Sequence, residues 1–169
     1  MKHVAFLRAI NVGGHIVKMD QLKRLFESMG FSNVETFIAS GNVIFDARTT
    51  TVRKVEAALA EALGYEVRTF LRTPQALAQI AATKLDANCT LYVGLLAEPP
   101  SDEAKRKVEA LSTDVDTLHV IGSELYWVCR RKFSDSTLTG AMLEKALGQK
   151  TTIRNITTIR RIAAKYPPK

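Results

Sequence analysis

Adjacent glycines and polar side chains follow the first apolar run of the chain, in a loop that contains Asn11, Gly13 and Gly14, with Lys18 shortly after. Two glycines let backbone N–H groups point outward beside a helix start, where the helix dipole also places partial positive charge. The loop is therefore a candidate anion-binding site to which Lys18 adds a full charge. A tight connection that needs glycine only for its backbone conformation explains the same residues equally well.

A second polar segment, Ser40, Gly41 and Asn42, separates two β-rich runs and offers a hydroxyl, an amide and a flexible backbone. These groups suit an oxygen-rich ligand, although serine and asparagine also favour turns for purely structural reasons. Arg8 lies inside the first apolar run, where a guanidinium is costly to bury unless it is paired. Arg8 therefore either bridges a carboxylate or points from a strand end into a site.

The third segment, around Thr152, Arg154 and Asn155, places a hydroxyl and an amide beside a cation just before the last helix. It has two interpretations: a second anion-binding helix start, or a helix cap made by Asn155. The apolar residues that follow, Ile156 and Ile159, begin a stripe that we expect to pack in the core.

The remaining reactive side chains give no recognisable catalytic or metal site. His3, His15 and His119 stand at no metal-ligand spacing, and we expect no metal and no cofactor. Cys89 and Cys129 are far from a Cys-x-x-Cys spacing, so both are interpreted as small buried thiols. No carboxylate or histidine pair suits acid–base catalysis, and no nucleophile elbow surrounds the second polar segment.

The charge of the chain is concentrated at its C-terminal end. The net charge is +7 over 169 residues, and Glu144 is the last acidic residue. Unopposed cations favour anionic partners, although a solvated basic helix is the plain alternative. No apolar run approaches the roughly 20 residues that span a bilayer, so we expect a cytoplasmic protein without a membrane partner. The cations that follow Glu144 are Lys145, Lys150, Arg154, Arg160, Arg161, Lys165 and Lys169.

Hydrophobic periodicity predicts the elements that position these segments. The first part of the chain has the order strand, helix, strand, strand, helix, strand, which is ferredoxin-like, and then an extra helix that starts at Pro74. Gly30 and Gly64 are expected to end the first two helices. The expected strands are 4–10, 34–38, 43–45 and 66–71, and the helices begin near residues 22, 52 and 73.

The same order returns in the second part of the chain. Ala62-Leu63-Gly64 recurs as Ala146-Leu147-Gly148, an offset of about 84 residues that indicates a duplication. The sequence thus predicts an α+β protein with two ferredoxin-like βαββαβ halves, 1–84 and 85–169, each with an antiparallel sheet and helices on one face. The expected strands are 90–96, 117–121, 125–129 and 151–153, and the helices are 102–111, 138–147 and 155–165.

Three signatures resemble those of the bacterial domain-of-unknown-function 1697 family: Leu7 to Gly14, Ser40 to Val43, and Thr152 to Asn155. The resemblance implies a duplicated ferredoxin-like protein and locates the site at these signatures, but it implies no reaction. Two positions depart from the family pattern. Thr137 follows Ser136 where the family has a lysine, and Ile156 stands where a tryptophan is common.

We therefore hypothesise that the three signatures converge on one cleft between the halves and bind a small anionic or phosphate-bearing ligand. Arg8 and Arg154 would hold the anion, because sites are usually built at strand and helix ends. One alternative is a transferase or hydrolase that acts on a phosphorylated small molecule in the same cleft, with His15 or Lys18 as proton carrier. Another is a non-specific nucleic-acid binder that uses the basic C-terminal region.

Overall fold

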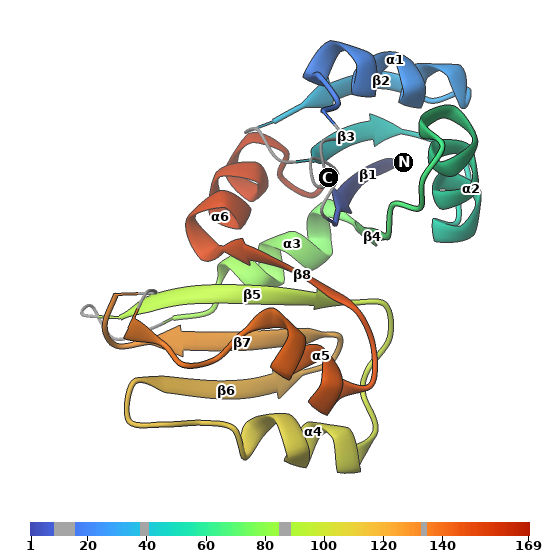
Figure 1. Cartoon of the computed structure of the whole chain (residues 1–169). Coiled ribbons are helices and arrows are strands. Elements are labelled where there is room, and N and C mark those ends of the chain that lie inside the picture. The colour runs from blue at the N-terminus through green and yellow to red at the C-terminus, as the bar shows by residue number, and fades with distance from the viewer. Residues whose placement is uncertain (9–15, 38–40, 85–88, 133–134) are drawn as a thin grey trace. The chain divides into compact units, whose positions relative to one another are not determined.

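The computed structural model describes residues 1–8, 16–37, 41–84, 89–132 and 135–169, and Figure 1 shows the order of their helices and strands. The chain forms two compact units. The first contains Met1–Ile80 together with Arg161–Lys169, and the second contains Ala81–Arg160. Each unit holds one four-stranded antiparallel sheet in a βαββαβ-like order, so the predicted α+β class and duplicated ferredoxin-like halves are confirmed. The sequence pattern does not predict that the last nine residues join the first unit.

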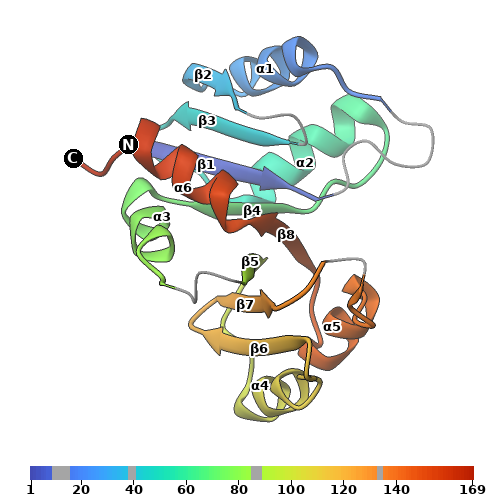
Figure 2. The same ribbon diagram turned by 90° about the vertical axis from the view of Figure 1, so that its left-hand side faces the viewer.

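The first sheet has the strand order β2-β3-β1-β4, and Figure 2 shows α1 and α2 beside it. Because successive side chains of a strand lie on opposite faces of the sheet, every second side chain points toward these helices. The two chain termini lie close together in both ribbon views. The elements are β1 (Lys2–Leu7), α1 (Met19–Ser28), β2 (Ser32–Thr36), β3 (Asn42–Asp46), α2 (Val52–Leu63), β4 (Thr69–Arg72) and α3 (Pro74–Ala81).

The core between the first sheet and its two helices is rich in aromatic rings. Phe26 on α1 and Phe45 on β3 are fully buried, with ring centroids 5.4 Å apart. Phe31 stacks on Phe45 at 4.4 Å. Helix α2 is capped at its start by Thr51, whose hydroxyl accepts a hydrogen bond from a first-turn N–H, and at its end by Gly64, which has a φ of 81°. The predicted helix ending at Gly64 is therefore confirmed.

The second sheet repeats the pattern with the strand order β6-β7-β5-β8. The turn between β6 and β7 contains Gly122, whose φ of 59° is a left-handed conformation that suits a two-residue hairpin. The strand β8 extends to Asn155, two residues beyond the predicted run. The elements are β5 (Thr90–Leu96), α4 (Asp102–Glu109), β6 (Asp116–Ile121), β7 (Glu124–Cys129), α5 (Gly140–Leu147), β8 (Thr151–Asn155) and α6 (Ile156–Lys165).

Side chains from α2, α4 and α5, and Ser112 in the turn after α4, accept hydrogen bonds from outward N–H groups on edge strands of both sheets. An edge strand with unpaired N–H groups invites pairing with another chain, and covering those groups suppresses it. Side chains cover N–H groups in this way on β4, β6 and β8, which are three of the four edge strands of the two sheets. The bonds run from Thr69 N to Glu56 (3.0 Å), from Leu118 N to Ser112 (2.9 Å), from Val120 N to Glu109 (3.0 Å) and from Thr151 N to Glu144 (3.2 Å).

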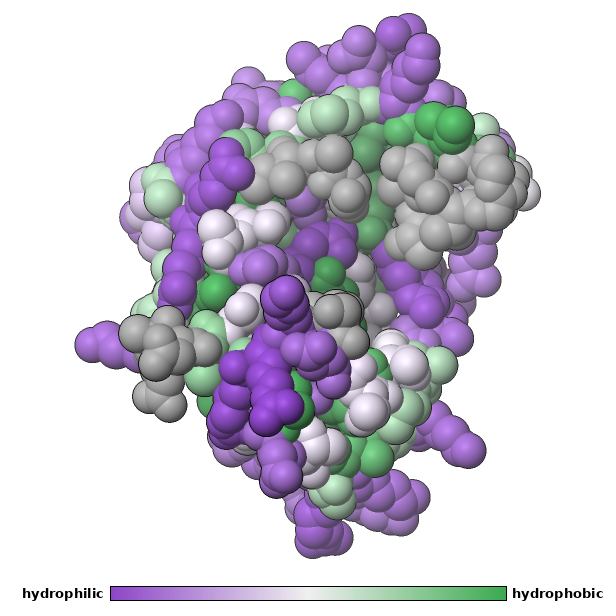
Figure 3. All heavy atoms as spheres, turned by 60° about the vertical axis from the view of Figure 1, so that its left-hand side comes forward, coloured by the Kyte–Doolittle hydropathy of each residue, from purple (hydrophilic) through white to green (hydrophobic). Residues whose placement is uncertain are grey.

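Hydrophilic residues cover much of the molecular face drawn in Figure 3, with apolar residues in small groups between them. Within the described ranges, the most exposed large apolar residue is Ile16, at 80%. Among the described residues, no helix has the length and the apolar character required to cross a membrane.

Candidate functional site

The predicted binding residues fall into two groups, one in each unit, and each group is described by itself. Four members, Asn11, Gly13, Gly14 and Ser40, lie outside the residues that the structure describes. The described members are Arg8, Lys18, Gly41 and Asn42 in the first unit, and Thr152, Arg154 and Asn155 in the second.

Backbone hydrogen bonds bring the end of β1 beside the turn that precedes β3. Leu7 N donates to Gly41 O at 2.8 Å, and Gly41 has a φ of 85°, a conformation that favours glycine. Arg8 N donates to Arg68 O at 2.9 Å, so the pairing of β1 with β4 continues one residue past the strand. The half-buried Arg8 therefore lies one residue after β1, whereas the predicted strand 4–10 placed it inside a strand.

Asn42 is only 2% exposed, and its amide closes the turn in which it lies. Asn42 Nδ2 donates to Phe37 O at 3.1 Å, and Phe37 N donates back to Asn42 O at 3.1 Å. Asn42 is the register partner of Phe6, so alternation places Asn42 and Arg8 on the same sheet face, opposite α1 and α2. These bonds match the structural interpretation of the turn, and a ligand contact by Asn42 stays a prediction.

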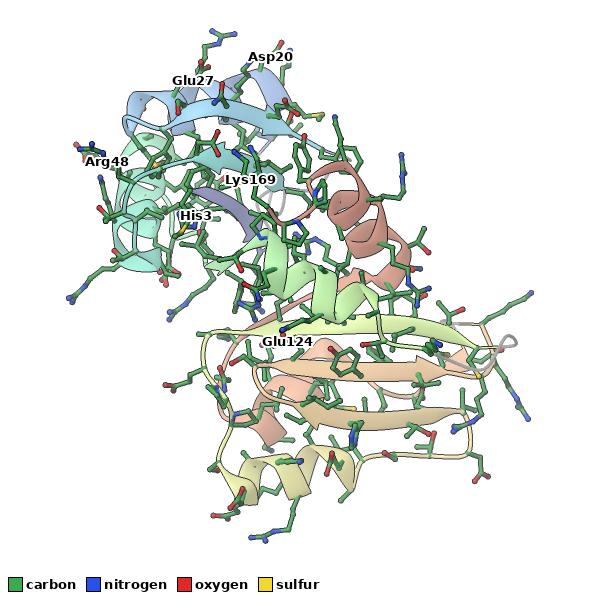
Figure 4. The ribbon with its side chains drawn as sticks, turned by 180° about the vertical axis from the view of Figure 1, so that it is seen from behind. His3, Asp20, Glu27, Arg48, Glu124 and Lys169 are labelled. Carbon is green, nitrogen blue, oxygen red and sulfur yellow. The ribbon has the colours of Figure 1, made fainter. Side chains whose placement is uncertain are left out.

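Lys18 directly precedes α1 and is exposed to solvent. Its carbonyl accepts the first helical hydrogen bond, from Leu22 N at 3.0 Å, and its side chain makes no capping bond in the described structure. Asp20 supplies a negative charge in the first turn, where it complements the helix dipole. Figure 4 shows Asp20 and Glu27 projecting from α1 away from the sheet. A ligand contact or proton-carrying role for Lys18 stays a prediction.

Arg154 lies on the edge strand β8 of the second sheet, directly opposite Val93 on β5. Its Nη1 donates to Thr152 Oγ1 at 2.7 Å and to Ile153 O at 3.1 Å. Thr152 is 5% exposed, and the neighbouring Val93 is fully buried. Burial lowers the pKa of Arg154 to about 10, so the guanidinium is partly desolvated and still charged at neutral pH.

Asn155 caps the last helix. Its Oδ1 accepts a hydrogen bond from Thr157 N at 2.9 Å, which satisfies one of the free N–H groups in the first turn of α6. The capping interpretation of Asn155 is thus the observed contact. Ile156, Ile159 and Ile162 are at most 4% exposed, so the predicted core stripe of this helix is confirmed.

The structure also brings together a carboxylate and an imidazole that sequence reasoning missed. Glu109 at the end of α4 lies 3.1 Å from His119 Nδ1 on β6, and the same carboxylate oxygen accepts the Val120 N–H. Cross-strand register places His119 opposite Tyr126, which is in turn opposite Val93, the neighbour of Arg154. No local spacing signals this pair, because the loop after α4 and the first three residues of β6 separate its members.

A second missed group surrounds the fully buried Asp116. Trp127 Nε1 and Ser136 Oγ each donate to its carboxylate at 2.7 Å. Its neighbour Cys129 is 1% exposed, and burial raises the pKa of the thiol, as expected for an unreactive cysteine. Cys89 is only half-buried, so its predicted burial is partial. Among the described residues, no cluster of His, Cys, Asp and Glu could hold a metal ion.

Most of the C-terminal cations make intramolecular contacts. Lys150 lies 3.7 Å from Glu144, and Lys165 lies 3.6 Å from Glu35 on β2. Arg161 lies 5.5 Å from the ring centroid of Phe37. Because carboxylates lie beside Lys150 and Lys165 and an aromatic ring lies beside Arg161, the terminal charge is less uniform than the sequence suggests.

The C-terminal end of α6 is fastened to the first sheet through one carboxylate. Tyr166 Oη donates to Glu35 Oε2, and the Lys2 ammonium lies 5.5 Å from the Tyr166 ring centroid. The hydrogen bond from Tyr166 lowers the pKa of Glu35, and burial raises the pKa of Tyr166. These contacts explain why the last nine residues belong to the first unit.

Comparisons with known proteins agree with the fold. The conserved bacterial protein SP0830 from Streptococcus pneumoniae has a similar structure, with a TM-score of 0.77 and 22% sequence identity over 99% of this chain and 98% of that one. A search of curated proteins gave no match. The family model described as a protein of unknown function (DUF1697) matches residues 1–126, which include the first two signatures but not the third. The chain therefore belongs to the DUF1697 family.

Proposed function

We propose that the protein binds a small anionic or phosphate-bearing ligand and that Arg154 is the principal cation of the site. The observation that carries this proposal is the partly desolvated guanidinium of Arg154 on β8, whose Nη1 donates to Thr152 Oγ1 and to Ile153 O. No reaction is assigned, because the described residues of the two signature groups are not arranged around a proton donor or acceptor of the usual kind.

Desolvation is the physical reason for choosing Arg154. Moving a cation out of water is unfavourable, and a partly desolvated guanidinium is therefore attracted more strongly to an anion than a fully hydrated one. An anion that reaches this guanidinium forms a charge-assisted hydrogen bond in a medium of lower dielectric constant than water, where the interaction is stronger. The planar guanidinium also suits two oxygens of one carboxylate or phosphate.

The remaining signature residues are proposed as further contacts. Arg8 is half-buried at a strand end and is the second candidate cation. Thr152 supplies a hydroxyl already hydrogen-bonded to Arg154. The other proposed contacts are Asn11, Gly13, Gly14, Lys18, Ser40, Gly41, Asn42 and Asn155.

A thermal-shift screen with nucleotides, sugar phosphates and small carboxylates tests the proposal. A ligand that binds only the folded state stabilises it by about 2.7 kcal/mol at 100 times its dissociation constant. We expect Arg154→Ala to abolish the shift and Arg154→Lys to retain part of it, because lysine keeps the charge but not the planar pair of donors. If Arg154→Ala melts at a lower temperature yet responds to every hit like the wild type, Arg154 is structural.

Arg130 provides the matched control. Its Nη2 donates to Thr117 Oγ1 at 2.6 Å, so it repeats the arginine–threonine contact of Arg154 in the same unit, but at an exposed position. Arg130→Ala should leave all ligand responses unchanged. A double-mutant cycle with Arg8→Ala then measures whether both arginines act on the same ligand.

The other two functions predict different results. Turnover of a stabilising compound would identify an enzyme. DNA binding that disappears at moderate salt and persists in Arg8→Ala and Arg154→Ala would identify a non-specific nucleic-acid binder. Lys145 and Lys169 would then be the residues to replace, because the described structure records no ion pair for either.

A further inference from the structure

Two aromatic side chains of the first unit meet at nearly a right angle beside a lysine. Phe37 follows β2 directly and Tyr166 follows α6 directly. Their ring centroids are 6.5 Å apart, and the ring planes make an angle of 86°. Lys165 Nζ lies 5.1 Å from the Phe37 centroid and 5.4 Å from the Tyr166 centroid. Both distances are within the range of about 6 Å over which an aromatic face attracts a cation, so one ammonium group contacts two perpendicular rings.

Glu35 supplies a negative charge to the same group of side chains. Its Oε2 lies 3.6 Å from Lys165 Nζ and accepts a hydrogen bond from Tyr166 Oη. The carboxylate therefore attracts the cation and also orients one of the two rings. Aromatic faces beside a carboxylate are the arrangement that holds methylated and quaternary ammonium groups. We call Phe37, Tyr166 and Glu35 the ammonium cage.

Backbone hydrogen bonds hold both rings of the ammonium cage in place. Phe37 N donates to Asn42 O at 3.1 Å, and Phe37 O accepts a bond from Asn42 Nδ2 at 3.1 Å. Tyr166 N donates to Ile162 O at 2.9 Å, which continues the helical bonding of α6 to this residue. The cage is thus formed before a ligand arrives, and a preformed site reduces the entropy cost of binding.

Lys165 is an exchangeable occupant of the cage. Its side chain is 52% exposed and that of Glu35 is 51% exposed, so water reaches both charges and their ion pair is weak. The primary ammonium of a lysine is compact and strongly hydrated. A trimethylammonium group is weakly hydrated, has no N–H to satisfy and presents methyl groups to the rings. The cage therefore suits a trimethylammonium group better than the lysine that occupies it.

Two further cations adjoin the rings. Lys2 Nζ lies 5.5 Å from the Tyr166 centroid and is paired with Asp46 at 3.2 Å. The Arg161 guanidinium lies 5.5 Å from the Phe37 centroid. A cationic ligand that displaces Lys165 replaces one positive charge with another, so the net charge inside the cage does not change.

We propose that the ammonium cage binds a trimethylammonium group and that Lys165 occupies the cage when no ligand is present. A small quaternary ammonium compound and a trimethylated lysine of a peptide both supply this group. When the ligand binds, the exposed Lys165 side chain turns into solvent. The site takes a cation, so it is independent of the anion proposed for Arg154.

An NMR titration of the full chain with tetramethylammonium chloride, compared with sodium chloride at the same concentration, tests this proposal. Binding is read from the ring signals of Phe37 and Tyr166. We expect Lys165→Ala to bind about tenfold more tightly than the wild type, because a tethered side chain competes at a millimolar effective concentration. Adding Phe37→Leu to Lys165→Ala should abolish binding, since leucine keeps apolar bulk but has no aromatic face.

Lys54→Ala is the matched control. Lys54 Nζ lies 5.7 Å from the centroid of Phe31 in the same unit, and that ring is only 7% exposed, so it is closed to a ligand. Removing Lys54 should leave the affinity for tetramethylammonium unchanged. Unchanged backbone shifts in the first sheet show that each variant is folded, and Lys165→Met replaces Lys165→Ala if the latter is not.

A short peptide that contains trimethyllysine, and the same peptide without the methyl groups, separate the two sources of the ligand. Tighter binding of the trimethylated peptide than of tetramethylammonium would identify a peptide ligand, and affinity no greater would identify a small ammonium compound. The proposal is overturned if neither probe shifts the ring signals of Lys165→Ala, or if the unmethylated peptide binds as well as the trimethylated one. Binding that persists after Phe37→Leu would also overturn it.

Discussion

Replacing Gly94 with alanine should destabilise the second unit by about 2 kcal/mol, because a methyl group has no room at the centre of β5. An added Cβ would lie 3.0 Å from Thr151 Oγ1 and 3.4 Å from Leu125 Cβ. Gly94 is not among the glycines with positive φ, so alanine fits the backbone and only the contact is unfavourable.

Thr151 cannot move aside without cost. Its hydroxyl donates to Leu95 O at 2.8 Å, and its N–H donates to Glu144 Oε1 at 3.2 Å. Rotating the hydroxyl away breaks a buried hydrogen bond, which costs about 1 kcal/mol. Strain from the remaining overlap with Leu125 adds about 1 kcal/mol more, at the lower end of the range for overpacking.

Urea unfolding followed by Trp127 fluorescence measures this loss, since the only tryptophan of the chain lies in the same unit. Thr151→Ala removes the clashing hydroxyl, so the double variant should be more stable than the sum of the two single effects, by about 1 kcal/mol. Gly140→Ala is the control: its Cβ would meet nothing within 4 Å, and its stability should be within about 0.5 kcal/mol of wild type. A neutral or stabilising Gly94→Ala would refute the close-contact reasoning.

Three further predictions concern buried titratable groups. Asp116→Ala should lower the free energy of unfolding by about 3 kcal/mol, because it leaves the buried Trp127 donor and the half-buried Ser136 donor without this acceptor. A loss below about 1 kcal/mol by urea titration would contradict this. Burial lowers the pKa of His3, so the folded state binds fewer protons than the unfolded state and stability should fall as the pH decreases below about 6.5. In His3→Phe that part of the pH dependence should disappear, and an identical pH profile would exclude His3 as its source. In Cys89→Ser, the remaining thiol of Cys129 should react with a disulfide reagent about 100-fold more slowly when folded than in urea, and equal rates would show that Cys129 is accessible.

Local patterns were sufficient to predict the elements of each unit. The strand Thr90–Leu96 has the predicted bounds, and the helix Val52–Leu63 ends at Gly64 as expected. Propensity, periodicity and capping act between residues a few positions apart, so they can be deduced from the order of neighbours alone. The buried face of α6 followed from the same rule, because the spacing of its isoleucines places them on one side of a helix.

Tertiary contacts decided the role of each polar signature. Asparagine is a residue type that suits ligand binding, and the sequence therefore predicts such a role for Asn42 and Asn155. The observed bond of Asn42 closes a turn, and that of Asn155 caps a helix. The burial that desolvates Arg154 depends on which residues of β5 face it, and register is fixed by long-range strand pairing. The pair Glu109 and His119 exists only because the end of a helix packs against an edge strand.

The sequence by itself determined the duplicated order of strands and helices and the places where polar segments interrupt them. Only the tertiary structure decided that the last nine residues complete the unit formed by the first eighty. The physical reason is the separation of the interacting residues along the sequence. Hydrophobic periodicity depends on residues a few positions apart, whereas the bond from Tyr166 to Glu35 joins residues 131 positions apart. Such a contact cannot be deduced from the local sequence pattern around Glu35 or around Tyr166.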